Sequence, residues 1–251
     1  MTLDTWKFYD ITHKKHLVCN PTSEAKLVHL VRLLDLPKGA GVVDIACGKG
    51  EFLIRLAEEY EVRGLGVDIS PYCIEDCKKK AADRLSKPNI KFTQMDGAEF
   101  RPEQPASLHL AACIGASWVF KDHNETLKTL KSWVVPGGLV VVGEPFWLHD
   151  PSQEYLDASG CQRESFGTHA DNVKVGEKQG LQLVYTIVSD QNDWDQYEGL
   201  QWLAADEYAR QNPNDPDITE LMNRVTSNKN IYLKWGRDTI GWAIYIFRRD
   251  Q

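Results

Sequence analysis

The first 145 residues alternate between two kinds of hydrophobic pattern. Over residues 23–34 the apolar side chains fall three or four positions apart, as on one face of a helix whose first residue, a serine, would cap it. Residues 42–46 then form a short, almost continuous apolar run that leads into Gly48 and Gly50, which is typical of a buried parallel strand entering a tight turn. Helical spacing returns over 51–60. The pattern therefore predicts a strand, a glycine-rich turn and a helix in direct succession.

The same alternation continues along the chain. We expect further strands over 64–69, 90–95, 108–114 and 139–142, helices over 71–85 and 124–134, and a turn at 136–138. Strands that alternate with helices of this length indicate βαβ units. Two more segments of strand character, 181–188 and 239–247, would complete the far edge. The predicted fold class is α/β, with a doubly wound, mostly parallel seven-stranded sheet that carries helices on both faces.

The segments outside this alternation would cover the sheet. Residues 193–228 are polar, rich in Trp, Tyr and Asp and partly helical in pattern, and residues 145–167 form a second covering segment. We therefore expect one domain over 1–251. It would consist of an N-terminal helical cover (1–40), a ligand-binding core (41–143) and a part that holds a helical lid and the last strands (144–251).

The composition and the net charge limit the kinds of molecule that this protein is expected to bind. Of the 251 residues, 42% are hydrophobic and 26% charged, as in ordinary globular proteins, and the net charge of -7 argues against a nucleic-acid partner. The N-terminus lacks the apolar run of a signal peptide, and no segment approaches the ~20 apolar residues of a membrane span. We expect a cytoplasmic protein, monomeric or homodimeric, with a small-molecule substrate and no contact with membranes.

The six cysteines do not follow the loop spacing of a disulfide framework, so we expect reduced thiols. Cys73 and Cys77 lie four positions apart on one face of a predicted helix. No second Cys or His pair stands nearby in the sequence to complete a tetrahedral metal site. We therefore expect no metal.

Candidate chemistry lies at the ends of the predicted strands, because open α/β sheets bind ligands beyond the carboxyl ends of their strands. Asp44 precedes the glycine-rich turn at the end of the first strand. Asp68 ends the second strand, about 20 residues beyond that turn, where an acid can accept both hydroxyls of a ribose. Asp96 ends the third strand. Acids at three consecutive strand ends form a more specific pattern than the glycine-rich turn alone.

These acids also bear on the choice of ligand. A dinucleotide-binding fingerprint requires a third glycine where this chain has Leu53. A pyrophosphate would be poorly served by Asp44 and Asp96, whereas an ammonium group and an exocyclic amine would both find acceptors there. The residues favour a nucleoside ligand that carries a positive charge.

The sequence resembles the class I S-adenosylmethionine-dependent methyltransferases. The resemblance rests on the segments 43–50, 66–70, 95–98 and 133–138, and it covers roughly residues 40–143 in the right order and spacing. Segments 20–23, 113–120, 235–238 and 241–243 further resemble a bacterial subgroup of small-molecule methyltransferases whose acceptors are mostly unassigned. The resemblance implies S-adenosylmethionine as cofactor, S-adenosylhomocysteine as product and a Rossmann-like methyltransferase fold, with residues 144–251 on the acceptor side.

The resemblance also implies roles for single residues. Asp44 and the turn with Gly48 and Gly50 would lie by the methionine moiety, Asp68 would hold the ribose and Asp96 would meet the adenine amine. The full set of expected cofactor-binding residues is Asp44, Ala46, Gly48, Gly50, Asp68, Ile69, Asp96, Gly97, Ala98 and Cys113. Where the family often has an acid in the fourth strand this chain has His109, so no catalytic role is carried over to that position.

A sulfonium is already an activated methyl donor, so the enzyme chiefly has to align the reactants and exclude water. If a general base is used, His123 and Glu144 are the candidates by position, with His149 a weaker one. Aromatic side chains that would wall an acceptor pocket, or equally form lid core, are Trp118, Phe120, Trp147 and Tyr155. The alternatives are a nicotinamide-dependent oxidoreductase and a non-catalytic S-adenosylmethionine-binding protein.

Overall fold

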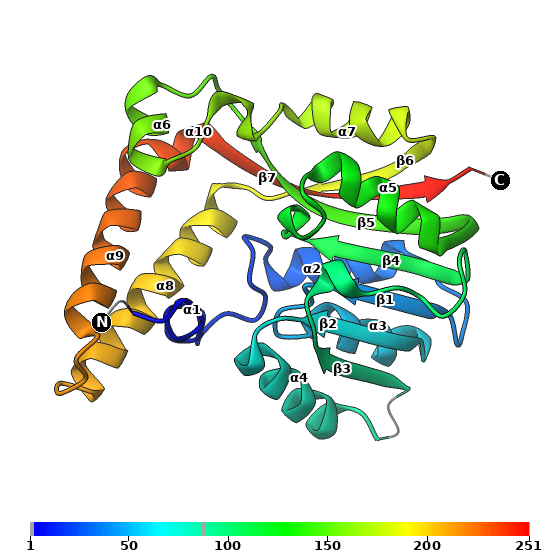
Figure 1. Ribbon diagram of the computed structural model, residues 1–251, viewed down its shortest axis with the longest axis horizontal. Coiled ribbons are helices and arrows are strands. Elements are labelled where there is room, and N and C mark those ends of the chain that lie inside the picture. Colours follow the sequence, from blue (N-terminus) through cyan, green and yellow to red (C-terminus); the bar gives the residue numbers. More distant parts are fainter. Residues whose placement is uncertain (1–2, 87–88, 251) are drawn as a thin grey trace.

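A single seven-stranded sheet runs through the computed structural model, which describes residues 3–86 and 89–250 (Figure 1). Its strands lie in the order β3-β2-β1-β4-β5-β7-β6. Neighbours from β3 to β5 pair in parallel, whereas β7 is antiparallel to both β5 and β6. The strands are β1 (Gly41–Ile45), β2 (Arg63–Asp68), β3 (Ile90–Gln94), β4 (Leu108–Ile114), β5 (Val134–Trp147), β6 (Leu181–Val188) and β7 (Ile240–Arg249). The predicted doubly wound, mostly parallel sheet is confirmed.

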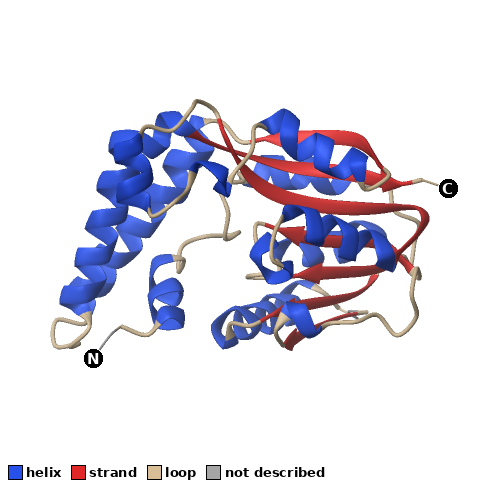
Figure 2. Ribbon diagram, turned by 45° about the horizontal axis from the view of Figure 1, so that its top comes forward, coloured by secondary structure: helices blue, strands red, loops and turns tan. Residues whose placement is uncertain are grey.

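Helices cover both faces of the sheet (Figure 2). Neighbouring strand residues point to opposite faces, so Val42 packs in one hydrophobic cluster and Val43 in the other. On the side of Val42 lie α2 (Glu24–Leu33), α3 (Glu51–Tyr60) and α4 (Pro71–Arg84). On the side of Val43 lie α5 (His123–Trp133) and α7 (His169–Lys178). The positions of α2, α3, α4 and α5 agree closely with the periods read from the sequence, because each helix buries one apolar stripe, whereas α7 was not predicted.

A helical part lies beyond the carboxyl ends of the parallel strands, at the left of Figure 1. It consists of α6 (Gln153–Ser159), α8 (Gln191–Gln211), α9 (Ile218–Ile231) and the short α10 (Arg237–Thr239). The N-terminal helix α1 (Thr5–Thr12) packs against it, with Phe8 and Ile11 in one cluster with Leu221 of α9. The N-terminal helix and the helices inserted before β7 therefore build one cover over the same edge of the sheet.

The predicted turn at 136–138 is wrong in its form, because these residues lie within β5. Leu108 of β4 pairs with Val134, but Leu110 pairs with Leu139, so the extra residues form an irregularity in a continuous strand. β5 also continues to Trp147, which pairs with Ile240 of β7. The long antiparallel partner therefore draws the first residues of the expected covering segment into the sheet.

Candidate active site

A cavity of about 580 Å³ lies between the carboxyl ends of the central strands and the helices α1 and α8. One part of its wall comes from the strand ends and the glycine-rich turn, and includes Asp44, Gly48 and Asp68. The opposite part comes from α1, the segment 13–22 that follows it, and α8. We call the first part the strand-end lobe and the second the helical lobe. Sheet and cover thus enclose one space from two sides.

The glycine-rich turn brings backbone close to this space. Ala46 and Gly50 both have left-handed backbones, with φ of 54° and 72°. At Gly50 a Cβ atom would lie 2.7 Å from Sγ of Cys77 and 2.8 Å from the ring of Phe92, so both conformation and packing require glycine. Ala46 carries the conformational strain of a non-glycine residue there. The turn ends at α3, whose first N–H groups lack partners within the helix.

Asp68 ties this turn to the next one. Its Oδ2 accepts a hydrogen bond from the Gly48 N–H at 2.8 Å, and its Oδ1 accepts one from the Ser70 N–H at 2.8 Å. Burial raises the pKa of the carboxyl, while these backbone donors oppose the shift. Asp68 also lines the cavity, so the remaining lone pairs of a fixed carboxylate are available to hydroxyl groups of a ligand.

Asp44 is a buried acid in the wall of the cavity. Its side chain is 3% exposed and lines the cavity, and within residues 3–86 and 89–250 no hydrogen bond reaches its carboxylate. Burial, with the nearby charge of Asp68, raises the pKa of Asp44 to about 8. A cation that entered the cavity would favour the ionised form. The site therefore has the electrostatics of a cation-binding end.

The expected cofactor residues divide between two environments. Asp44, Ala46, Gly48 and Asp68 line the cavity, and Gly50 shapes the turn behind it. The cavity wall does not include the remaining ones, Ile69, Asp96, Gly97, Ala98 and Cys113. Asp96 accepts a hydrogen bond from the Ala98 N–H at 2.9 Å and so caps a short turn that follows β3. Cys113 is fully buried in β4.

His123 and Glu144 come together, but outside the cavity wall. His123 Nδ1 lies 3.3 Å from Glu144 Oε1, and His123 Nε2 lies 3.1 Å from the carbonyl oxygen of Asn172 in α7. Burial raises the pKa of Glu144, and His123 opposes this shift. His149 is exposed. The role of His123 and Glu144 in proton transfer stays a prediction, and the lining of the cavity gives it no support.

Of the four aromatic residues named from the sequence, Trp118 lines the cavity, with 73% of its surface exposed. Phe120 packs instead on the ring of Trp133. Trp147 and Tyr155 pack edge to face in a cluster of the helical cover, at 6.1 Å between ring centroids. Trp147 and Tyr155 therefore pack in the helical cover, whereas Phe120 packs in the sheet cluster around Trp133, and a role of these three in an acceptor pocket stays a prediction.

Sequence reasoning missed the residues that the cover contributes. His13 and Tyr197 both line the cavity, and His13 Nε2 lies 3.0 Å from Tyr197 Oη. The two positions are 184 residues apart, and neither belongs to a motif of the strand ends. Trp6, Tyr9 and Trp194 add aromatic surface to the same lobe. Only the docking of α1 against α8 could reveal this part of the site.

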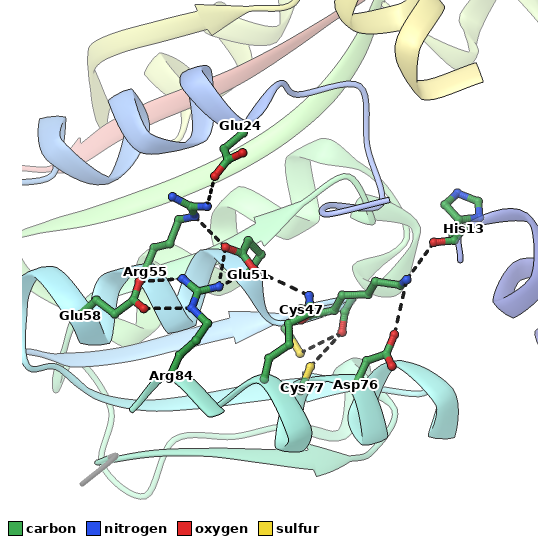
Figure 3. A network of polar contacts seen from close by, with 12 residues as sticks. His13, Glu24, Cys47, Glu51, Arg55, Glu58, Asp76, Cys77 and Arg84 are labelled. Carbon is green, nitrogen blue, oxygen red and sulfur yellow. Dashed lines mark hydrogen bonds and ion pairs between the residues drawn. The ribbon is translucent and has the colours of Figure 1, made fainter. Parts of the chain in front are cut away.

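Lys49 fastens the segment after α1 to the glycine-rich turn. It is 7% exposed, and its ammonium donates to the carbonyl oxygen of His13 at 2.8 Å and lies 3.4 Å from Asp76 Oδ2 (Figure 3). Beside it, Glu51 accepts hydrogen bonds from Arg55 and Arg84, both at 2.7 Å, and is 1% exposed. These charges hold α3, α4 and the N-terminal segment around the turn.

Residues 42–138 match a family model described as a methyltransferase domain. The chain is similar to a solved SAM-dependent methyltransferase from Geobacter sulfurreducens in complex with S-adenosyl-L-homocysteine, at 26% identity and a TM-score of 0.91 over 98% of this chain and 99% of that one. A second such complex, from Thiobacillus denitrificans, is 28% identical with a TM-score of 0.89, again over 98% and 99% of the two chains. The similarity includes both the sheet and its helical cover.

Two curated relatives complete the comparison. The uncharacterized Escherichia coli protein YjhP is 27% identical over 97% of this chain and 98% of its own length. A trans-aconitate 2-methyltransferase of Variovorax paradoxus is 28% identical over 53% of this chain and 49% of its own length. The match to the second relative thus spans about half of each protein.

Within the described residues, no helix is both long and apolar enough to cross a bilayer, and no three His, Cys, Asp or Glu side chains are placed to hold a metal.

Proposed function

From the premise that this chain belongs to the class I S-adenosylmethionine-dependent methyltransferases, we propose that it methylates a small neutral or cationic molecule bound in the helical lobe of the cavity. The methyl donor is S-adenosylmethionine and the product S-adenosylhomocysteine. The observation that carries the proposal is the single cavity shared by two buried acids at strand ends and by an aromatic cover.

The residues of the strand-end lobe fit the cofactor. Asp68 is fixed by two backbone N–H groups and would accept the ribose hydroxyls, while Asp44 would face the positively charged methionine end. The glycine-rich turn would let backbone approach the same end. When bound, the cofactor supplies a methyl group already activated on its sulfonium. Asp96 and Ala98, which follow β3, would meet the adenine.

The helical lobe fits an acceptor without negative charge. Its wall presents Trp6, Tyr9, Trp194 and Tyr197, with Asp10 as a charged neighbour. Among the described residues, Lys49 is the one lysine or arginine in the whole cavity wall, and its ammonium is already held by two carbonyl oxygens and Asp76. A polycarboxylate such as the one named for the Variovorax relative would find no free cation here.

The protein's part in the reaction is alignment and exclusion of water. α1 and α8 would close over the acceptor, and Lys49 would keep the segment 13–22 in place against the turn. We retain the division into a cover (1–40), a cofactor core (41–143) and an acceptor-side part (144–251) as part of this proposal. The cytoplasmic location stays a prediction, as does the monomeric or homodimeric state.

Binding and transfer test the proposal together. Isothermal titration calorimetry of purified protein with S-adenosylhomocysteine should give micromolar-range binding, about -8 kcal/mol. Transfer of labelled methyl from S-adenosylmethionine is then measured on matched panels of amines, alcohols and carboxylates. We expect labelled products among amines or alcohols. Failure of S-adenosylhomocysteine to bind would contradict the cofactor site, and transfer confined to carboxylates would contradict the acceptor class.

A further inference from the structure

A chain of hydrogen bonds leads from the backbone of α1 to the phenol of Tyr197. The Thr12 hydroxyl donates to the carbonyl oxygen of Phe8 at 2.9 Å, so its only hydrogen is committed. The same oxygen lies 3.1 Å from His13 Nδ1, and it can only accept there. His13 therefore carries its proton on Nδ1, and Nε2 is bare. Because Nε2 lies 3.0 Å from Tyr197 Oη, the phenol must donate to it.

This assignment requires a neutral imidazole, which the surroundings of His13 provide. Burial, the His16 imidazole and the charge of Lys49 lower the pKa of His13 to about 3, against a smaller opposing effect of a hydrogen bond with the backbone of Tyr9. The His13 and His16 rings lie 4.7 Å apart, and the Lys49 ammonium binds the carbonyl oxygen of His13 itself. His13 is therefore uncharged with one ring proton across the physiological pH range.

Tyr197 stays a phenol for similar reasons. Burial raises its pKa well above the usual range, and the groups that add to this shift are Cys19, Glu198 and Tyr9. Its place on α8 is fixed by His16, whose Nε2 lies 2.8 Å from the carbonyl oxygen of Tyr197. Among the described residues, His13 is the one partner of the phenol oxygen. The Tyr197 hydroxyl therefore donates its hydrogen to His13. The remaining lone pairs of the phenol oxygen are on a side chain that lines the cavity.

We propose that Tyr197 is a specificity-determining residue that offers the acceptor molecule a hydrogen-bond acceptor and never a donor. Thr12 and His13 act as positioning residues that impose this polarity. The inference rests on the proposed function and deepens it, because it names the acceptor class as a small neutral amine or alcohol that brings an N–H or O–H group to Tyr197.

A Tyr197 oxygen that only accepts hydrogen bonds has two chemical consequences. An amine or alcohol that donates its hydrogen to Tyr197 keeps a lone pair directed elsewhere, free to be aligned with the methyl group. A carboxylate or an ether offers only lone pairs and would leave the phenol oxygen opposite another acceptor, a buried arrangement that costs affinity. Selection by this single contact therefore separates molecules of nearly the same shape.

The tautomer of His13 is the first test, and it needs no substrate. Long-range proton–nitrogen NMR correlation of the full-length protein, with the signals assigned through His13→Gln, should show protonated Nδ1 and bare Nε2 from pH 5 to pH 8. Thr12→Ser keeps the hydroxyl and should retain this pattern, whereas Thr12→Val should lose it. Protonated Nε2 in the wild-type protein would overturn the proposal.

Matched probes test the contact itself. With protein saturated by S-adenosylhomocysteine, NMR titration should show that phenol binds about tenfold more tightly than anisole, and aniline about tenfold more tightly than N,N-dimethylaniline. Tyr197→Phe should remove both differences while the variant still binds S-adenosylhomocysteine, which verifies its fold. Equal affinities within each pair, or no binding of phenol and aniline to the saturated protein, would overturn the inference. A protein that cannot be saturated would instead contradict the proposed function and leave the tautomer test valid.

Discussion

Asp44 shows how one residue can oppose folding and support binding. A carboxyl group that is 3% exposed and has no hydrogen-bond partner among the described residues gains nothing from ionisation in the folded state. Its position at the end of β1 nevertheless places it in the cavity wall. A cationic group of a bound ligand would stabilise the ionised carboxylate of Asp44 and so offset the cost of burying it.

The pH dependence of stability follows from this. The pKa of Asp44 rises from the usual 3.8 to about 8 on folding, so its contribution to stability is fully present below pH 3.8 and is lost as pH rises through about 8. Asp44→Asn should therefore stabilise the ligand-free protein by about 4 kcal/mol at pH 7 and by less than about 1 kcal/mol near pH 4. Thermal unfolding of both proteins across this range measures the difference.

The same substitution should weaken cofactor binding. We expect S-adenosylmethionine to bind wild-type protein more tightly as pH rises from 6 to 8, because the cation favours ionised Asp44, and Asp44→Asn to lose this trend. The exposed Asp83→Asn is the control for both measurements. A variant that is no more stable at pH 7, or that binds the cofactor as the wild type does, would contradict the assigned role of Asp44.

Among the elements, the segment that joins α1 to α2 is bound to the glycine-rich turn by a buried cation. Lys49 reaches from the glycine-rich turn to the carbonyl oxygens of His13 and Lys14, at 2.8 and 3.3 Å. The segment contributes Cys19 and Asn20 to the cavity wall, so its position affects both lobes. A buried ammonium with three oxygen neighbours orders loops that have little regular structure of their own.

Lys49→Met should therefore release this segment. We expect amide hydrogen exchange over residues 13–20 to rise at least about tenfold and the affinity for S-adenosylhomocysteine to fall, with little change in the strands of the sheet. Lys38→Met removes an exposed pair with Glu61 and serves as the matched control. Unchanged exchange over residues 13–20 in Lys49→Met would show that the segment is held by other contacts.

At the scale of the whole molecule, α1 forms one packed unit with α8 and α9. Phe8 and Ile11 of α1 share a cluster with Ala205 of α8 and Leu221 of α9, and Leu221 is fully buried. The helical lobe of the cavity lies between this unit and the sheet. Its geometry therefore depends on contacts between segments some 200 residues apart in the sequence, such as Leu3 and Glu220.

Leu221→Ala should test that dependence. Removing this buried side chain should lower the free energy of unfolding by about 2–5 kcal/mol and also weaken acceptor binding, because α1 loses its support. Leu233→Ala, at a leucine that is 53% exposed, should stay within about 0.5 kcal/mol of the wild type. Denaturant unfolding measures both variants. Equal effects of the two substitutions would contradict the packing of α1 on α9.

Local pattern was sufficient for the sheet and for its strand-end lobe. The strands around Val42 and Val43, and the helices between them, follow from apolar periods that each element satisfies by burying one face. Asp44, Gly48 and Asp68 could be named because parallel strands end at one edge, so sequence position alone brings these residues together.

Tertiary structure alone decided the helical lobe. His13 and Tyr197 meet because α1 docks on α8, and no short-range pattern records a contact between residues 184 positions apart. The same holds for Trp147, which the sequence could place near the strand ends but which β7 draws into the sheet. The strand-end lobe was thus set by repeated local units, and the helical lobe by the packing of α1 against α8 and α9.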